Sequence, residues 1–377
     1  MSDMKGRKLN IVLLGHKRVP SREGGIEVVV EELATRMAAQ GHNVTVLNRS
    51  GHHIAGVEFD TANLKEYNGF KIKKVPTINR KGLAAATSSF FGCVQAAFGN
   101  YDVVHIHAEG PAFFSWIPKM MHKKVIVTVH GLDWKRDKWS GFASWYIKKG
   151  EEQAVKHADH IIVLSRNVQK YFKEKYGRNT VFIPNGVNRP EIFEVNEIRK
   201  KWGLDKGSFI LYVGRIVPEK GLDILLKAWK EIETDKKLVI AGSSSDTDEF
   251  FKKVKGLADD RVVFTGFTTG RPLKELYSNA YLYCLPSNLE GMPLTVLEAM
   301  SYGNCVLTSD IEECTEVVED NGVTFKKGDI DDLRNKLQKL LDSPDIVEGY
   351  RKDAQDFICG KYSWDDVVSR TLEKYTH

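Results

Sequence analysis

Two glutamates eight residues apart, Glu290 and Glu298, lie in a segment with the features of a strand, a loop and a helix. The apolar run 280–285 before them predicts a buried strand. Pro293 suits the first turn of a helix, and the residues from Leu294 onward are good helix formers. Glu290 is therefore expected just before a helix N-terminus. The free N–H groups of such a terminus attract phosphate or sugar oxygens.

The spacing of the two glutamates does not favour a hydrolytic pair. Eight helical residues would separate Glu290 and Glu298 by about 12 Å. Carboxylates that act together on one glycosidic bond lie about 5–5.5 Å apart in retaining enzymes and about 6.5–9.5 Å apart in inverting ones. Two carboxylates that hold different hydroxyls of an extended ligand fit better. Glu298 alone fits a helix-surface glutamate, but its neighbours Leu297 and Ala299 suggest a partly buried helix, where a charge needs a partner.

A second candidate segment, residues 214–221, places two cations after a predicted strand. It contains Arg215 and Lys220 and lacks the Gly-Lys-Ser/Thr ending of a P-loop. An arginine offers a planar fork of donors to phosphate oxygens, and a lysine offers a compact charge. A solvated basic turn is the alternative interpretation of this segment.

A pair of glycines, Gly24 and Gly25, follows the first predicted strand and opens a helix. Ligands of open α/β sheets bind at the carboxyl ends of strands, and glycines there let the backbone approach a phosphate closely. The pair is a weak signal by itself. The sequence has no GxGxxG, so the dinucleotide-binding fingerprint is absent.

Three histidines come from two neighbouring predicted strands. His130 ends one strand and is followed by Gly131, so we favour a functional role for it at the sheet edge. His105 and His107 alternate around Ile106 and share one face, with only His107 near the strand end. For His105, an ordinary core or surface histidine is expected.

Nothing in the sequence has convincing metal-ligand spacing. Asp133 and Asp137 lie in a charged loop and would bind a cation only with further partners. The cysteines are odd in number and form no CxxC pair, which predicts reduced thiols and no structural zinc site. They are Cys93, Cys284, Cys305, Cys314 and Cys359. Residues 1–14 do not fit a secretory signal, so a cytoplasmic protein is expected.

The elements that carry these residues form two series in which strands and helices alternate. In the first, strands are predicted at 8–15, 43–48, 102–107, 124–130, 160–165 and 180–184, with a helix at 26–40. In the second, strands are predicted at 208–214, 237–242, 262–266, 280–285, 304–309 and 323–325, with helices at 222–232, 272–279 and 330–341. This alternation is typical of parallel sheets, and 377 residues exceed one ordinary core. We predict an α/β protein of two Rossmann-like domains that face each other across a cleft, with residues 183–188 as the linker.

Charge is unevenly distributed between the two halves. Residues 1–190 carry 29 Lys+Arg against 16 Asp+Glu, a net charge of +13, and residues 191–377 carry 26 against 34, a net charge of −8. The difference is either chance variation between two solvated surfaces or a sign that the first half faces an anionic partner, such as a membrane surface or a phosphate-bearing acceptor. Residues 82–101 carry no charge. A helix packed on the sheet is the favoured interpretation there, and a membrane-dipping helix is the alternative.

Taken together, these motifs resemble the retaining glycosyltransferases of family 4, which have the GT-B fold. The signature E-x7-E matches Glu290 and Glu298, and the other matching motifs occur in the family's order, so the resemblance covers nearly the whole chain. These are Gly24-Gly25, His130, the linker 183–187 and the Gly-Arg and Lys-Gly dipeptides within 214–221. The segment 130–139 is similar to a bacterial subgroup that is often labelled rhamnosyltransferase-like and is associated with surface polysaccharides.

The resemblance implies a role for each candidate residue. Arg215 and Lys220 would hold the donor's diphosphate, Glu298 its ribose, and His130 its sugar. The sugar would also be held by the segment Glu290, Gly291, Met292, Pro293, Leu294 and Thr295, and Gly24 and Gly25 would close over the phosphates. The reaction implied is metal-independent transfer of a hexose-type sugar, with retention, from a nucleotide-diphosphate sugar to a saccharide or lipid-linked acceptor. No cofactor is expected, since the two cations would neutralise the leaving diphosphate.

The resemblance also implies a division of labour between domains. An acceptor-binding N-terminal domain would comprise residues 1–187 and a final helix, 362–377, that crosses back to it, and residues 188–361 would bind the donor. The enzyme would be cytoplasmic. Peripheral contact of the basic half with anionic membrane is one of the interpretations of the charge difference rather than an implication of the resemblance. A sugar-nucleotide epimerase or hydrolase of the same fold and a non-catalytic nucleotide-sugar-binding protein are the alternatives. Nucleic-acid binding is disfavoured because the basic residues are dispersed rather than clustered with aromatic ones.

Overall fold

The computed structural model describes residues 7–51, 64–78, 80, 83–135, 141–244 and 248–376. The chain divides into two compact units: unit 1 comprises residues 1–185 and 364–377, and unit 2 comprises residues 186–363. Each unit is a mostly parallel sheet covered by helices, so the α/β fold with two Rossmann-like domains is confirmed. The divisions lie within two residues of the predicted ones at 187/188 and 361/362.

Unit 1 is built on an eight-stranded sheet in the order β3-β4-β2-β1-β5-β6-β7-β8, in which only β3 is antiparallel to its neighbour. The strands are β1 (Asn10–Leu14), β2 (Asn43–Arg49), β3 (Glu66–Tyr67), β4 (Phe70–Val75), β5 (Val103–His107), β6 (Lys124–Val129), β7 (His160–Val163) and β8 (Val181–Phe182). The central strands are buried along nearly their whole length because helices cover both faces of the sheet.

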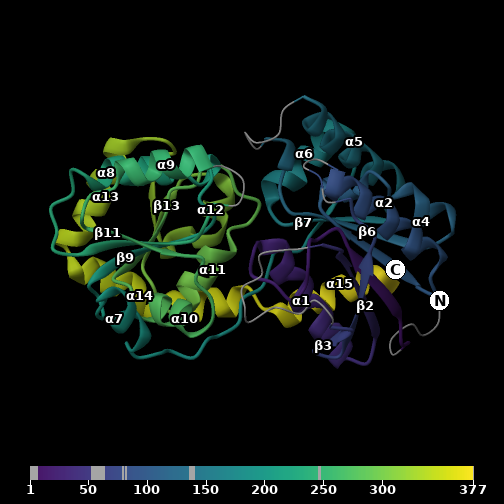
Figure 1. Cartoon of the computed structure of the whole chain (residues 1–377), viewed down its shortest axis with the longest axis horizontal. Helices are drawn as coiled ribbons and strands as arrows, with labels where there is room; N and C mark the ends of the chain where they lie inside the picture. The colour runs from purple at the N-terminus through teal and green to yellow at the C-terminus, as the bar shows by residue number, and fades with distance from the viewer. Residues whose placement is uncertain are drawn as a thin grey trace. The chain divides into compact units, whose positions relative to one another are not determined.

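The helices of unit 1 lie on both sides of this sheet (Figure 1). They are α1 (Gly25–Ala39), α2 (Leu83–Phe98), α3 (Glu109–Ala112), α4 (Trp116–Met120), α5 (Phe142–His157), α6 (Arg166–Tyr176) and α15 (Trp364–Thr376), with a 3-10 turn at Asp133–Lys135. Helices α1 and α15 cover one face, and α2 and α5 cover the other (Figure 1). The favoured interpretation of residues 82–101 is thus confirmed for the described part, because α2 packs on the sheet.

The final helix belongs to unit 1, as the sequence predicts. Helix α15 packs against α1, where Arg36 Nε lies 3.1 Å from an Asp365 carboxylate oxygen. The two chain segments that connect the units pair with each other, since Val187 N donates to Tyr362 O at 2.8 Å. The crossover of the last helix is therefore held at its start by a backbone hydrogen bond and further along by contacts to α1.

Unit 2 has six parallel strands in the order β11-β10-β9-β12-β13-β14. The strands are β9 (Phe209–Val213), β10 (Lys237–Ala241), β11 (Val262–Gly266), β12 (Leu282–Leu285), β13 (Val306–Ser309) and β14 (Val323–Phe325). Counted along the chain this is the order 3-2-1-4-5-6 of the doubly wound fold, whose direction of winding reverses between β9 and β12. Parallel sheets of this kind bind ligands at the carboxyl ends of the two strands that flank the reversal.

The helices of unit 2 also form two layers (Figure 1). They are α7 (Glu197–Trp202), α8 (Leu222–Trp229), α9 (Asp248–Leu257), α10 (Gly270–Asn279), α11 (Leu294–Ser301), α12 (Glu312–Val318), α13 (Ile330–Asp342) and α14 (Pro344–Lys361), with 3-10 turns at Pro218–Lys220 and Glu319–Asn321. Helices α8 and α13 pack together on one face, and α11 and α14 pack together on the other. Among the described residues, no helix is long and apolar enough to cross a membrane.

Candidate functional site

The two loops that carry most of the predicted site residues emerge from neighbouring strands of unit 2. Residues 214–221 follow β9, and residues 286–293 follow β12, and these two strands are paired. They flank the point where the sheet reverses its winding, so both loops lie at the edge where such sheets bind ligands. The fold therefore brings together two segments that are about 70 residues apart in the sequence.

Lys220 and Glu290 form an ion pair between these loops. Lys220 Nζ lies 2.5 Å from Glu290 Oε1, and the side chains are only 15% and 9% exposed. Ser287 Oγ donates to the same carboxylate oxygen at 2.6 Å. Because a half-buried charge needs a partner, this network fixes the position of the ammonium group. An ammonium group has three N–H donors, and the pair with Glu290 uses one of them.

Close backbone packing holds the two loops against each other. Asn288 N donates to Glu219 O at 2.8 Å. Gly221 has a φ of +65°, and a Cβ there would lie 2.0 Å from Pro286 O. Only glycine fits this position, because a side chain would meet the backbone of the other loop as well as being strained. Gly221 is thus the residue that lets the Lys220 loop lie against the Glu290 loop.

Arg215 lies in the same loop as Lys220 and is half-buried. Its carbonyl oxygen accepts a hydrogen bond from the Tyr212 hydroxyl at 3.0 Å. Burial raises the pKa of Tyr212, and the Glu290 carboxylate raises that pKa further while Arg215 opposes it. These effects place the charges of Arg215 and Glu290 near the same buried hydroxyl.

Glu298 has surroundings different from those of Glu290. Helix α11 begins at Leu294, with Pro293 as its N-cap, and Glu298 is half-buried on it between buried neighbours. The Tyr277 hydroxyl donates to Glu298 Oε2 at 3.0 Å. The expectation that this carboxylate needs a partner is confirmed. The two glutamates have different partners, Lys220 for Glu290 and Tyr277 for Glu298. The intervening Gly291, Met292 and Pro293 are buried, and Leu294 and Thr295 are half-buried.

The remaining predicted residues lie in unit 1. Gly24 has extended backbone and caps α1, which begins at Gly25. His130 follows β6 and is half-buried, with Nε2 3.0 Å from His107 Nδ1. His107 is fully buried, and burial together with the neighbouring histidines holds its pKa well below the usual value. The His107 ring beside His130 is therefore a neutral imidazole.

His105 is a core residue, as expected. It is fully buried, and its Nδ1 lies 2.6 Å from the Tyr375 hydroxyl of α15 while its Nε2 lies 2.7 Å from Thr128 Oγ1. Burial lowers the pKa of His105 to about 3. The histidine thus links β5 to β6 and to the final helix.

Sequence models of known families match both halves of the chain. The model described as Glycosyltransferase Family 4 matches residues 23–189, and the model described as Glycosyl transferases group 1 matches residues 194–357. The chain carries a family 4 and a group 1 glycosyltransferase domain.

Individual proteins show similarity along the whole chain. A phosphatidyl-myo-inositol mannosyltransferase of Mycobacterium leprae is 25% identical, over 93% of this glycosyltransferase and 92% of the relative. The sucrose-phosphate synthase structure from Thermosynechococcus elongatus has a TM-score of 0.83 at 21% identity, over 98% of each chain. HepE of Anabaena in complex with UDP-glucose has a TM-score of 0.81 at 16% identity, over 98% of this chain and 99% of HepE. At these identities the solved structures show a shared GT-B fold.

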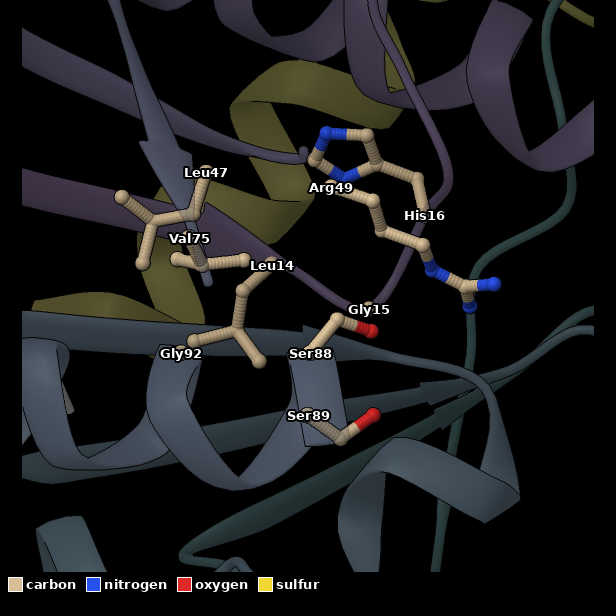
Figure 2. A pocket seen from close by; sticks show the side chains of 9 residues that line it. All are labelled: Leu14, Gly15, His16, Leu47, Arg49, Val75, Ser88, Ser89 and Gly92. Atoms are coloured by element: carbon tan, nitrogen blue, oxygen red, sulfur yellow. The ribbon is translucent and has the colours of Figure 1, made fainter. Parts of the chain in front are cut away.

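One pocket of the glycosyltransferase was not predicted from the sequence. It lies in unit 1 where β1, β2 and β4 end beside α2, and Figure 2 shows the Arg49 side chain there between His16 and the hydroxyls of Ser88 and Ser89. Its lining residues are Leu14, Gly15, His16, Leu47, Arg49, Val75, Ser88, Ser89 and Gly92. Burial lowers the pKa of His16 to about 4, so this imidazole is neutral.

Arg49 is the distinctive residue of this pocket. It is half-buried, and within the described ranges its Nε has no hydrogen-bond partner, nor does His16 Nδ1. Burial lowers the pKa of Arg49, whereas the nearby carboxylates Glu27 and Glu23 act to raise it. The pocket therefore offers a guanidinium donor and two serine hydroxyls to a polar ligand. The only sequence signal for it was an arginine at the end of the second strand.

A buried pair of carboxyl groups supports the turn that follows His130. Glu109 and Glu151 are both fully buried, and Glu109 Oε2 accepts from Asp133 N at 2.8 Å. Burial raises the pKa of Glu109 well above its usual value, and the charge of Asp133 adds to this. Glu151 accepts a hydrogen bond from the Tyr171 hydroxyl at 2.8 Å. This support keeps the 133–135 turn next to the histidine-bearing strand end.

The structure offers no support for a cation at Asp133. Among the described residues, no group of three or more His, Cys, Asp or Glu side chains is arranged to hold a metal ion. Asp137, the other residue of that expectation, lies outside the described residues, as do Arg136, Lys138 and Trp139. All five cysteines are free.

Proposed function

We propose that this glycosyltransferase moves a sugar from a nucleotide-diphosphate sugar to a saccharide or lipid-linked acceptor. The observation that carries the proposal is the Lys220–Glu290 ion pair at the carboxyl edge of the unit 2 sheet, with Arg215 in the same loop. A cationic site that is fixed before the ligand arrives stabilises the negative charge that develops on a leaving diphosphate. HepE, which has a similar fold, is known from a complex with UDP-glucose, which supports this class of donor.

The residues of unit 2 divide the proposed donor between them. Arg215 and Lys220 would bind the diphosphate oxygens, the former as a planar fork and the latter through ammonium donors. Glu298 on α11 would accept hydrogen bonds from the ribose hydroxyls. Glu290 and the backbone of residues 291–295 would hold the sugar, with the N-terminus of α11 as a source of free N–H groups.

Unit 1 would supply the other contacts. His130 would bind the donor sugar, and its ring is held by the neutral His107. Gly24 and Gly25, at the start of α1, would close over the phosphates. We propose departure and attack on one face of the sugar, which retains its anomeric configuration, and no metal requirement, because Arg215 and Lys220 neutralise the diphosphate.

One polar group of the acceptor would contact Arg49 at the Arg49 pocket, which has room for about one water molecule. Arg49 offers guanidinium donors to a phosphate, a carboxylate or a sugar hydroxyl. The Ser88 and Ser89 hydroxyls donate to Ala85 O at 3.1 and 2.6 Å, so their oxygens are left as acceptors for a sugar hydroxyl. A relative named as a phosphatidyl-myo-inositol mannosyltransferase supports a phosphate-bearing lipid as one such acceptor. The proposal includes a role in the synthesis of surface polysaccharide, as in the rhamnosyltransferase-like bacterial subgroup. It also includes peripheral contact of the basic half with anionic membrane.

The experiment that tests the reaction compares a panel of nucleotide sugars with and without a glycolipid extract as the source of acceptor. We expect release of the nucleoside diphosphate, together with glycosylated product, only when the acceptor is present. Turnover in water alone would indicate a hydrolase or an epimerase. Nucleotide binding without turnover under any condition would indicate a non-catalytic binding protein. Either result would overturn the transferase proposal.

A further inference from the structure

Helix α2 exposes its large apolar side chains and buries its small ones. The residues that it buries against the core are small: Ser88, Ser89, Gly92, Cys93, Ala96 and Ala97. Its exposed residues are large and apolar: Leu83, Phe90, Phe91 and Phe98. A helix on the surface of a protein in water normally shows the opposite pattern, with charged residues outside. Helix α2 carries no charge at all.

The exposed residues of α2 form one continuous stripe. Leu83, Phe90 and Phe98 recur at seven- and eight-residue spacing, which returns to the same side of a helix after two turns. Phe91 adjoins this line, and the half-buried Val94 lies between its turns. The stripe thus runs along the whole length of the helix.

Aromatic contacts extend the stripe from α2 to α5. The ring of Phe90 contacts Phe114, whose neighbour Phe113 contacts Trp145, with ring centroids 5.4 and 6.5 Å apart respectively. Trp145 stacks on Phe142 at 5.3 Å. Phe142 is 77% exposed, and Phe98 at the far end of α2 is 74% exposed. We call this surface the aromatic face: Leu83, Phe90, Phe91, Phe98, Phe142 and Trp145, joined through Phe113 and Phe114.

Exposed apolar residues are concentrated in this part of the chain. Of the twelve large hydrophobic side chains that are exposed in the described residues, ten lie between residues 78 and 145. The other two, Ile192 and Ile346, lie in unit 2. Scattered apolar residues are normal on a surface, whereas a contiguous patch marks an interaction site.

The charges around the aromatic face suit an anionic partner. Residues 83–160 contain nine Lys+Arg and seven Asp+Glu. Two of the acidic residues, Glu109 and Glu151, are fully buried. In the described part of this segment, the charged residues that are not buried are seven basic and four acidic ones. Exposed Phe, Trp and Met residues among lysines are typical of helices that lie in the plane of a membrane interface.

We propose that the aromatic face is the surface by which the protein lies on an anionic lipid bilayer, with α2 in the plane of the interface. Its phenyl and indole rings would enter the boundary between headgroups and acyl chains, and the nearby lysines would contact anionic headgroups. The inference rests on the proposed peripheral membrane contact, which was argued from charge, and adds a defined surface and an apolar contribution. It does not depend on the identity of the donor or on the transfer reaction.

The test is sedimentation of the full chain with phosphatidylcholine vesicles, with and without phosphatidylglycerol. The variant Phe98→Ser/Phe142→Ser/Trp145→Ser alters three exposed positions of the aromatic face, and Ile192→Ser/Ile346→Ser is the matched control in unit 2. We expect the wild type and the control to bind vesicles that contain phosphatidylglycerol. The triple variant should bind at least about tenfold more weakly, because it lacks three of the inserting rings.

Three outcomes would overturn the proposal, and they differ in what else they affect. If the wild type and the triple variant bind equally well and their binding is salt-sensitive, the membrane contact is purely electrostatic and the aromatic face does not take part in it. No binding to any vesicle would remove the membrane contact altogether while leaving the transfer reaction to its own assay. Self-association of the wild type without lipid, lost in the triple variant, would assign the face to a second copy of the chain.

Discussion

At the residue scale, the contacts of Lys220 explain how the proposed donor site holds an ammonium group in a fixed position before a ligand binds. The ammonium group is held 2.5 Å from Glu290 Oε1 and is mostly buried, so its position is determined without a ligand. An incoming diphosphate would compete with Glu290 for this ammonium, and the carboxylate would then be available to a sugar hydroxyl. The ion pair thus connects the two roles that are proposed for the loops.

We expect Lys220→Ala to lower the rate of sugar transfer by about 10²–10³, the usual cost of losing one preorganised stabiliser of developing charge. The variant should remain folded, as judged by its circular dichroism spectrum. Lys227→Ala, an exposed cation on α8, is the matched control and should transfer sugar at the wild-type rate. Near-normal kinetics in Lys220→Ala would exclude the lysine from the diphosphate site.

At this scale, the sequence predicts the position of a residue well where that residue directly follows a strand. The segments with Lys220 and Glu290 were predicted to follow strands, and the carboxyl ends of parallel strands meet at one edge of a sheet. Arg49 and the Glu109–Glu151 pair were missed. Arg49 lies beside Ser88, and Glu109 lies beside Glu151, and each pair is about 40 residues apart in the sequence. A local sequence pattern cannot predict contacts over such a separation.

At the element scale, strands were more predictable than helices. Strands of a parallel sheet are covered on both faces and read as short apolar runs, so β1, β2, β9, β12 and β14 were located within two residues at either end. Helices α5, α6 and α14 were not predicted, because each buries only two to four residues and so has a short apolar face. Helix α8 was predicted to extend to residue 232 but ends at Trp229.

The packing of α5 on α3 gives a prediction about stability. A Cβ at Gly150 of α5 would lie 1.9 Å from Glu109 O, so Gly150→Ala must push the two helices apart, at a cost of about 1–3 kcal/mol. Gly349 in α14 has no atom within 4 Å of such a Cβ, and Gly349→Ala should stabilise the helix by up to about 1 kcal/mol. Thermal unfolding should rank Gly150→Ala below the wild type and Gly349→Ala at or above it. Equal midpoints for the two variants would contradict the close packing of α5 and α3.

At the scale of the whole molecule, two units of one architecture carry different surfaces. Both sheets reverse their winding at a central pair of strands, β1 with β5 in unit 1 and β9 with β12 in unit 2. Unit 2 holds the ion-paired cation at that edge, whereas unit 1 holds the Arg49 pocket and the aromatic face. The alternation of strands and helices predicted the architecture, but it gave no information on the aromatic face, since the exposure of α2 depends on its tertiary packing.

The most direct test of the central claim is the binding of nucleoside diphosphates, measured by calorimetric titration with UDP, GDP, ADP and dTDP. A donor site built on Lys220 predicts that at least one of them binds the wild type and the Lys227→Ala variant equally well. Its affinity for Lys220→Ala should be at least about tenfold lower, since a charge-assisted hydrogen bond is lost. Binding of none of the four, or equal binding by Lys220→Ala, would contradict the claim that unit 2 holds a nucleotide-sugar donor at this ion pair.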